Sequence, residues 1–311
     1  MSLDDLHDPS AHRWTRSQPL AGDASTRRYT RVWNDEHRSF VLVEYPQEVR
    51  GDMPRDLQVA DWLSGLGVRI PAILARDLGA GWLVVEDLGV GDAEAVLRRT
   101  GEPDRLGVAL GALQPLEVLA ARPISSLAPW NPPLDRWRMR WELSGFELWF
   151  VRYNRGATPS STLDSWLDHL AEAVARHPRR ICHRDYHLNN LFWRPSGGTA
   201  VIDAQDILVG PDTYDAVSLV EERAMPELLT LQDREALRAA WAKRTGAVAG
   251  WRERWDLVRI QRSLKVLGTF ARLKASGRTE YAGWMASQAA RLAADSARLE
   301  LPSELVDLLL D

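Results

Sequence analysis

The hydrophobic pattern of this chain changes once, near residue 90, and the change divides its 311 residues into two unlike parts. Before the change, short apolar or alternating runs lie between turn residues, which is typical of strands; these runs are 26–33, 39–46, 68–79 and 80–89. In this part only the segment 53–67 repeats its apolar residues at helical spacing and ends on glycine. The first part is therefore predicted as a set of strands around one helix.

Helical spacing dominates the rest of the chain. Apolar residues recur at intervals of three and four in 92–100, 104–121, 134–154 and 161–177, and more helices are expected toward the C-terminus. A strand-like pair interrupts the helices at 190–194 and 199–204, with the turn sequence PSGG between its members. We predict an α+β fold with two lobes: a small β-rich lobe over residues 1–88 and a large, mainly helical lobe over 89–311.

Composition narrows the possible classes of protein. Acidic residues exceed basic ones, with a net charge of −4, which argues against a general nucleic-acid binder. The single cysteine, Cys182, cannot form an intramolecular disulfide and fits a reducing compartment. The N-terminal residues lack the apolar core of a signal peptide, and no run approaches the length of a membrane span. We expect a cytoplasmic protein, monomeric or homodimeric, with no nucleic-acid or membrane partner.

The segment HRDYHLNN, residues 183–190, leads into the predicted hairpin. Asp185 is followed five residues later by Asn190, and Asp203 comes at the end of the second strand-like run. A hairpin brings its two strand ends together, so the Asn190 amide and the Asp203 carboxylate are expected to converge. Oxygen ligands of this kind suit Mg²⁺, which usually keeps waters and substrate phosphates as further ligands. Asp185 is then expected nearby, where it accepts a proton from a nucleophilic hydroxyl.

The same region offers other candidate roles for its side chains. His183 and His187 lie four residues apart, but in a loop, and no cysteine or third histidine is placed to complete a zinc site. A hydrogen-bonding role of His183 toward the loop backbone is favoured instead. Asp206 is either a second metal contact or a helix cap, and both remain open. No base is placed to activate Cys182 as a nucleophile, so a structural role is expected for it.

The loop pattern H-R-D-x-x-x-x-N is present from His183 to Asn190, and HRDYHLNNLFW with AVIDAQD resembles the motifs of aminoglycoside phosphotransferase-like kinases. Three further segments, LAGDASTRRYTRV, WELSGFELWF and VGPDTYDAVSL, are similar to segments of bacterial anomeric sugar kinases. Those kinases phosphorylate N-acetylmuramate and N-acetylglucosamine at C1 in cell-wall recycling. The resemblance covers roughly residues 20–225.

The resemblance implies a protein-kinase-like bilobal fold and the transfer of a phosphoryl group from ATP, with Mg²⁺, to a small sugar acceptor. It assigns Asp185 as catalytic base, Asn190 and Asp203 as Mg²⁺ ligands, and Asp215 as a support of the catalytic loop, beside the structural role already expected for His183. The nucleotide is expected to contact Gly22, Ser25, Thr26, Arg28 and the backbone near Glu86 and Leu88. The acceptor is expected to contact Arg184, Glu142 and Gln205.

One departure from the kinase pattern concerns the nucleotide phosphates. Kinases normally place a lysine on the third strand to pair with these phosphates, here near Val43 or Glu44, yet no lysine precedes Lys243. Either an arginine takes this charge or the nucleotide binds more weakly than in typical relatives. The candidate arginines are Arg27, Arg28 and Arg31.

A second departure concerns the acceptor. Leu188, Asn189 and Ala204 differ from the residues expected for the sugar kinases, which leaves the identity of the sugar open. Another sugar, an antibiotic or a choline-like alcohol is an alternative acceptor. A catalytically inactive nucleotide-binding relative is the remaining alternative, and the missing strand lysine is its only support.

Overall fold

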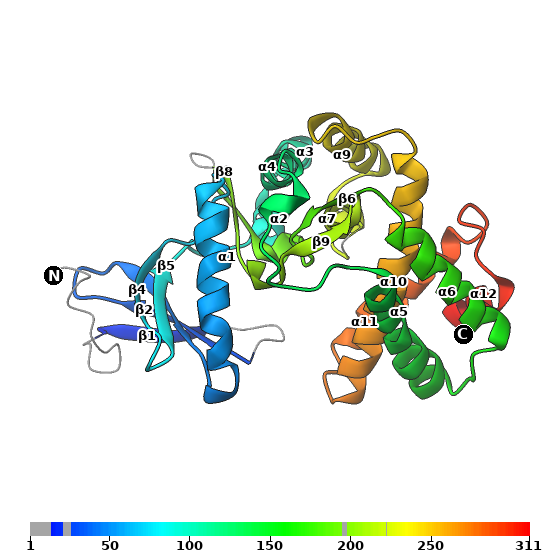
Figure 1. Cartoon of the computed structure of the whole chain (residues 1–311), viewed down its shortest axis with the longest axis horizontal. Coiled ribbons are helices and arrows are strands. Elements are labelled where there is room, and N and C mark those ends of the chain that lie inside the picture. Colours follow the sequence, from blue (N-terminus) through cyan, green and yellow to red (C-terminus); the bar gives the residue numbers. More distant parts are fainter. Residues whose placement is uncertain (1–13, 21–25, 195–197, 222) are drawn as a thin grey trace. The chain divides into compact units, whose positions relative to one another are not determined.

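The computed structural model describes residues 14–20, 26–194, 198–221 and 223–311 (Figure 1). They form two compact units. The first unit consists of the described part of Met1–Val96 together with Asn189–Gln205, and the second consists of Leu97–Leu188 together with Asp206–Asp311. The predicted lobe boundary between residues 88 and 89 assigns the hairpin to the second lobe, whereas the compact units assign it to the first.

An antiparallel sheet of five strands and one helix build the core of the first unit (Figure 1). The sheet order is β1-β2-β3-β5-β4, and the strands are β1 (Arg16–Leu20), β2 (Arg28–Trp33), β3 (Ser39–Glu44), β4 (Ile73–Asp77) and β5 (Trp82–Glu86). Because side chains alternate along a strand, Val43 and Leu83 lie on one face with Met53 and Leu57 of α1 (Met53–Gly65). The predicted strands around one helix are confirmed.

The polar hairpin also belongs to the first unit. It consists of β7 (Leu191–Arg194) and β8 (Gly198–Val201), which pair antiparallel with Leu191 opposite Val201. The backbone N–H of Val201 donates to the carbonyl of Arg69 at 2.8 Å, and Arg69 and Ala200 form a parallel bridge. These backbone contacts tie the hairpin to the segment between α1 and β4.

Helices make up most of the second unit. They include α3 (Glu102–Gly111), α4 (Gln114–Ala120), α5 (Arg136–Gly145), the π-helix η4 (Phe146–Asn154), α6 (Ser161–Ala175), α7 (Tyr214–Val220), α8 (Met225–Leu228), α9 (Leu231–Arg244), α10 (Trp251–Ala275), α11 (Tyr281–Ala294) and α12 (Ser303–Leu310). Helix α2 (Ala93–Arg99) crosses from the first unit into the second. The long helix α10 packs against α5, η4, α6, α7 and α11 (Figure 1). None of the described helices is long and apolar enough to cross a membrane.

A short two-stranded sheet lies among these helices. Its strands, β6 (Arg179–Cys182) and β9 (Leu208–Pro211), pair antiparallel with Cys182 opposite Leu208. Neither strand is predicted from the sequence, because each is four residues long and β9 contains both Gly210 and Pro211, which weaken strand patterns. Their function in the fold is to hold the segment that follows Cys182.

Two predicted helices differ from the observed ones. The segment 104–121 divides between α3 and α4, where Pro115 stands in the first turn of the second helix and lacks the N–H that a continuous helix requires. The segment 134–154 divides into α5 and the π-helix η4. At this junction Gly268 of α10 lies so close that a Cβ on it would be 2.6 Å from the Gly145 carbonyl carbon and from the Phe146 nitrogen. Close backbone packing therefore accompanies the change of helix type.

Candidate active site

The segment after β6 is held by a buried carboxylate. Asp215, at the start of α7, accepts the backbone N–H of His183 at 2.6 Å and that of Arg184 at 2.9 Å. Burial raises the pKa of Asp215, while the charge of His183 and the two N–H donors oppose that rise. Arg184 has a φ of +82°, a left-handed conformation that is uncommon for a residue with a side chain. The two hydrogen bonds to Asp215 hold the backbone directly before the Arg184 Cα, and they help the loop to keep this conformation.

Asp185 is the next residue after Arg184, and its carboxylate is surrounded by cationic side chains of the second unit. Burial alone would raise the pKa of Asp185, but the charges of Lys265, Arg262 and Arg184 outweigh burial and hold the pKa below its ordinary value. The carboxylate is therefore ionised at neutral pH. An ionised, half-buried carboxylate can accept a proton, which is the chemistry predicted for this residue.

An ionic network surrounds Glu142 of α5. Its carboxylate lies 3.1 Å from the Lys265 ammonium, accepts a hydrogen bond from Gln261 at 3.1 Å and lies 3.5 Å from the Arg184 guanidinium. Burial alone would raise the pKa of Glu142, but Lys265 and Arg184 hold it below its ordinary value. Arg184 also pairs with Asp206 at 3.0 Å. Arg184 and Glu142, predicted as acceptor contacts, thus bind each other, and contact of either with an acceptor stays a prediction.

Helix α10 contributes residues to this region that are not among those predicted from the sequence. Arg262 donates to the carbonyl of Arg184 at 3.2 Å and to the Ser218 hydroxyl at 2.5 Å, and its guanidinium lies over the Tyr214 ring. Lys265 is also close to Tyr214, with 3.2 Å between the ammonium and the hydroxyl. The sequence does contain a signal for these residues. Three polar or charged side chains interrupt the apolar pattern in the middle of α10, namely Gln261, Arg262 and Lys265.

The two ends of the hairpin meet in the first unit. Asn190 precedes β7, Asp203 follows β8 by two residues, and the N–H of Ile202 donates to the carbonyl of Asn190 at 3.0 Å. Asp203 is exposed, has a φ of +61°, and accepts a hydrogen bond from the Gln205 side chain at 2.8 Å. An amide and an exposed carboxylate at adjacent strand ends fit Mg²⁺ as a partial ligand set.

Other metals fit the described residues less well. Within the part of the chain that the structure describes, His, Cys, Asp and Glu side chains form no group of three that could hold a metal ion. A zinc site needs such a group, whereas a Mg²⁺ site completed by phosphates and water does not. His187 lies in an environment that lowers its pKa, chiefly by burial.

The residues predicted to contact the nucleotide belong to the first unit. Gly22 and Ser25 lie outside the described residues. Thr26 and Arg28 are exposed, and the Arg28 guanidinium lies 3.6 Å from the Glu44 carboxylate. At the end of β5, the N–H of Glu86 donates to the carbonyl of Ala72 at 2.8 Å. In the connector that follows, Leu88 is partly exposed.

Arg31 holds this connector in place. It donates to both carboxylate oxygens of Asp87, at 2.7 and 2.9 Å, and to the carbonyl of Gly89 at 2.8 Å. Burial would raise the pKa of Asp87, but the bonds from Arg31, Ser39 and Gly89 lower it below its ordinary value. Arg31 is thus bound to the connector by three hydrogen bonds.

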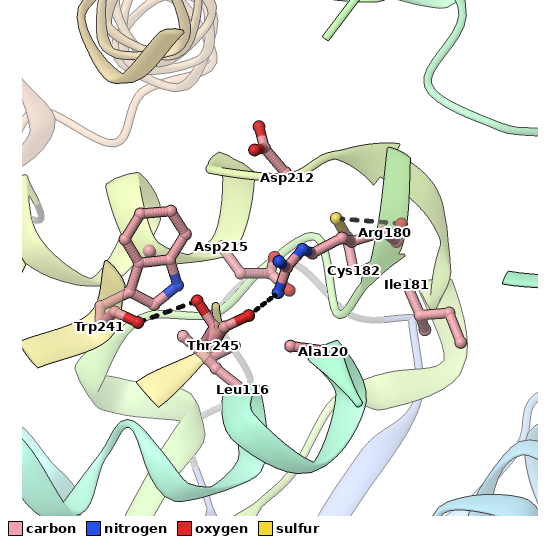
Figure 2. A pocket seen from close by; sticks show the side chains of 10 residues that line it. Leu116, Ala120, Arg180, Ile181, Cys182, Asp212, Asp215, Trp241 and Thr245 are labelled. Carbon is pink, nitrogen blue, oxygen red and sulfur yellow. Dashed lines mark hydrogen bonds between the residues drawn. The ribbon is translucent and has the colours of Figure 1, made fainter. Parts of the chain in front are cut away.

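A small pocket lies behind β6 in the second unit (Figure 2). Its walls include Asp215, Cys182 and Arg180, and Arg180 donates to the carbonyl of Thr245 at 2.8 Å. The volume of ≈ 20 Å³ accommodates about one water molecule and no substrate. Burial raises the pKa of the Cys182 thiol well above its ordinary value, which makes the thiol a poor nucleophile.

Comparisons with known proteins identify the family. The sequence profile of the phosphotransferase enzyme family (APH) matches residues 16–257. The N-acetylmuramate/N-acetylglucosamine kinase of Pseudomonas aeruginosa is 34% identical over 278 residues, which cover 85% of this chain and 79% of that kinase. The kinase of the same name from Neisseria meningitidis is 30% identical, over 81% of this chain and 77% of its own length.

Solved structures show the same fold at low sequence identity. The aminoglycoside-3'-phosphotransferase of type VIII matches with a TM-score of 0.59 at 17% identity, covering 80% of this chain and 93% of that protein. Choline kinase LicA from Streptococcus pneumoniae matches with a TM-score of 0.57 at 13% identity, and the match covers 88% of this chain and 93% of that kinase. The predicted protein-kinase-like fold is confirmed. The chain belongs to the phosphotransferase enzyme family and is a kinase.

Proposed function

We propose that this kinase transfers the γ-phosphoryl group of ATP to the anomeric hydroxyl of N-acetylmuramate or N-acetylglucosamine. One observation carries the proposal: the 34% identity to the Pseudomonas aeruginosa kinase that is named for these two sugars, over most of both chains. The solved structures of similar fold include an aminoglycoside phosphotransferase and a choline kinase, but at identities of 17% and below they support only the fold. An amino sugar is therefore the favoured acceptor.

Asp185 is the proposed catalytic base. The cations Lys265, Arg262 and Arg184 keep its carboxylate ionised at neutral pH, so it can take a proton. In the proposed step, the acceptor hydroxyl donates its proton to Asp185 while its oxygen bonds to the γ-phosphorus. The bond between that phosphorus and the bridging oxygen breaks, and ADP leaves with the oxygen.

Asn190 and Asp203 are the proposed ligands of Mg²⁺. The ion, when bound, compensates the charge of the nucleotide phosphates. The contribution of the chain is to hold an amide and a carboxylate at adjacent strand ends, with Gln205 orienting the Asp203 carboxylate through a 2.8 Å hydrogen bond. Gln205 is thereby proposed to orient a ligand of the metal in addition to its predicted contact with the acceptor.

The connector after β5 is the proposed adenine contact. The Glu86 N–H, at the end of β5, already donates to Ala72, so the backbone that follows it, Leu88 included, is proposed to bind the base. The bidentate pair between Arg31 and Asp87 fixes the shape of this segment. A pre-organised connector lowers the conformational entropy that is lost when the nucleotide binds.

The test is an acceptor panel monitored by ADP release from Mg-ATP. The panel contains N-acetylmuramate, N-acetylglucosamine, glucosamine, choline and an aminoglycoside. We expect the two N-acetylated sugars to have the highest kcat/KM, and Asp185→Asn to lower kcat by about 10²- to 10⁴-fold, the usual contribution of a general base. Preferential turnover of choline or the aminoglycoside would assign another acceptor. Absence of turnover with every acceptor would favour an inactive relative.

A further inference from the structure

The first unit contains no lysine, so another group has to neutralise the nucleotide phosphates. We propose that Arg27, held by Asp56 of α1, is the cation that binds the ATP phosphates in place of the strand lysine of other kinases. This inference rests on the proposed use of ATP, and it does not depend on which acceptor is phosphorylated. It selects one residue from the three arginines that the sequence leaves open.

The contacts of the three arginines separate them. Arg31 is bound to Asp87 and to the carbonyl of Gly89 in the connector. The Arg28 side chain is 72% exposed and only 3.6 Å from Glu44, itself 40% exposed, so it is a surface pair of little energetic value. The Arg27 side chain is 15% exposed and lies 3.2 Å from Asp56, whose side chain is 8% exposed. Only the Arg27 guanidinium is therefore both sheltered from water and paired to a helix.

The position of Arg27 agrees with the position of the missing lysine. Tyr29 stands opposite Val43 in the pairing of β2 with β3, and side chains alternate along each strand, so Val43 rather than Glu44 points toward α1. The Arg27 guanidinium lies 5.1 Å from the ring centre of Tyr45, two residues beyond Val43 on the same face of the sheet. Asp56, in the first turn of α1, also accepts a hydrogen bond from the Tyr45 hydroxyl at 3.1 Å.

Arg27 also lies within electrostatic range of the proposed metal ligand. Burial alone would lower the pKa of Arg27, but nearby acidic groups raise it above its ordinary value. The Asp203 carboxylate is one of these groups. In a kinase the phosphate-binding cation and the metal both neutralise the same phosphates. A guanidinium near Asp203, oriented by a carboxylate on α1, meets this requirement, and its fork of donors suits two phosphate oxygens at once.

The experiment measures binding of Mg-ATP and of adenosine by calorimetry, without any acceptor. Arg27→Met is expected to weaken Mg-ATP binding by about 10- to 100-fold, the loss of a charge-assisted contact, and to leave adenosine binding unchanged. Arg27→Lys is expected to retain most of the affinity. Arg27→Met/Asp56→Asn removes both members of the pair and leaves no uncompensated carboxylate, so it is expected to fold and to show the same selective loss.

Arg76, exposed on β4, provides the matched control, and Arg76→Met is expected to bind both ligands as the wild type does. The proposal is overturned if Arg27→Met binds Mg-ATP normally, or if Arg28→Met shows the selective loss instead. It is also overturned if the Arg27 variants lose adenosine in parallel, because that result indicates a structural role. A wild-type protein that binds Mg-ATP but phosphorylates no sugar contradicts the proposed acceptor and leaves the assignment of Arg27 standing.

Discussion

The Asp215 carboxylate accepts the backbone N–H of His183 at 2.6 Å, and its other oxygen accepts the next N–H along the chain at 2.9 Å. This relationship places a buried charge directly behind the loop that carries Asp185. We expect Asp215→Ala to destabilise the fold by about 2–3 kcal/mol, because hydrogen bonds to a charged acceptor are lost in a buried position. We also expect kcat to decrease more than the affinity for Mg-ATP.

The measurements for Asp215→Ala are urea denaturation, the initial rate and the dissociation constant of Mg-ATP. Asp307→Asn, on an exposed position of α12, is the control and is expected to match the wild type in all three. A variant that keeps wild-type kcat would show that the loop does not need Asp215.

Asp203 is expected to determine the magnesium requirement. Asp203→Asn replaces a charged ligand by a neutral one, so we expect the half-saturating Mg²⁺ concentration to rise at least about tenfold at a fixed ATP concentration. The measurement is the initial rate across a magnesium titration, after removal of bound metal with EDTA. Asp61→Asn, exposed on α1, is the control. An unchanged magnesium dependence in Asp203→Asn would remove Asp203 from the metal site.

His177 is expected to make stability depend on pH. Burial lowers its pKa from 6.5 to about 4, and its Nδ1 has no hydrogen-bond partner among the described residues. Below pH 6.5 the unfolded chain binds a proton there, whereas the folded chain binds it only near pH 4. Stability therefore falls as the pH decreases from about 6.5 to about 4, on the order of 1–2 kcal/mol after discounting for solvent screening.

The measurement for His177 is the urea midpoint between pH 4 and pH 7.5. His177→Asn removes the titrating group, so we expect a smaller decrease of the midpoint with acid. His169 is exposed on α6, and His169→Asn is expected to retain the wild-type pH dependence. Identical slopes for wild type and His177→Asn would contradict the prediction.

Gly268 is expected to tolerate no side chain. A Cβ at this position would lie 2.6 Å from the Gly145 carbonyl carbon, a contact with backbone that cannot be relieved by a rotamer change. We predict that Gly268→Ala destabilises the fold by about 1–3 kcal/mol through overpacking. Gly283→Ala is the matched helical control, since nothing lies within 4 Å of its Cβ, and it is expected to stabilise by up to about 1 kcal/mol. The measurement is the thermal unfolding temperature of both variants. Equal changes of this temperature in Gly268→Ala and Gly283→Ala would contradict the packing argument.

The features that could be predicted from the sequence depend on local pattern. Alternation in β2 and β3, the amphipathic spacing of α1, and the hairpin that brings Asn190 near Ile202 each involve neighbouring segments. The sequence therefore sufficed to predict the α+β fold, the loop and the paired strand ends. The π-helix η4 could not be predicted, because its hydrophobic pattern continues that of α5.

The features that could not be predicted depend on contacts between distant segments. Lys265 joins Glu142 across more than a hundred residues, and neither residue carries a local signal of the other. The choice between Arg27 and Arg28 depends on which side chain contacts Asp56, a residue of another element, the helix α1. The strands β6 and β9 are too short for a pattern of their own, so only their pairing defines them.

The position of the phosphate on the product tests whether this protein is an anomeric sugar kinase. The protein is incubated with Mg-ATP and N-acetylglucosamine, and the product is analysed by phosphorus-coupled proton NMR, with the methyl glycoside of the same sugar as a blocked acceptor. We predict a product with phosphorus coupled to the anomeric proton and no phosphorylation of the methyl glycoside. With Asp185→Asn the same product is expected to form about 10²- to 10⁴-fold more slowly. A phosphate on any other hydroxyl, or turnover of the methyl glycoside, would contradict the account.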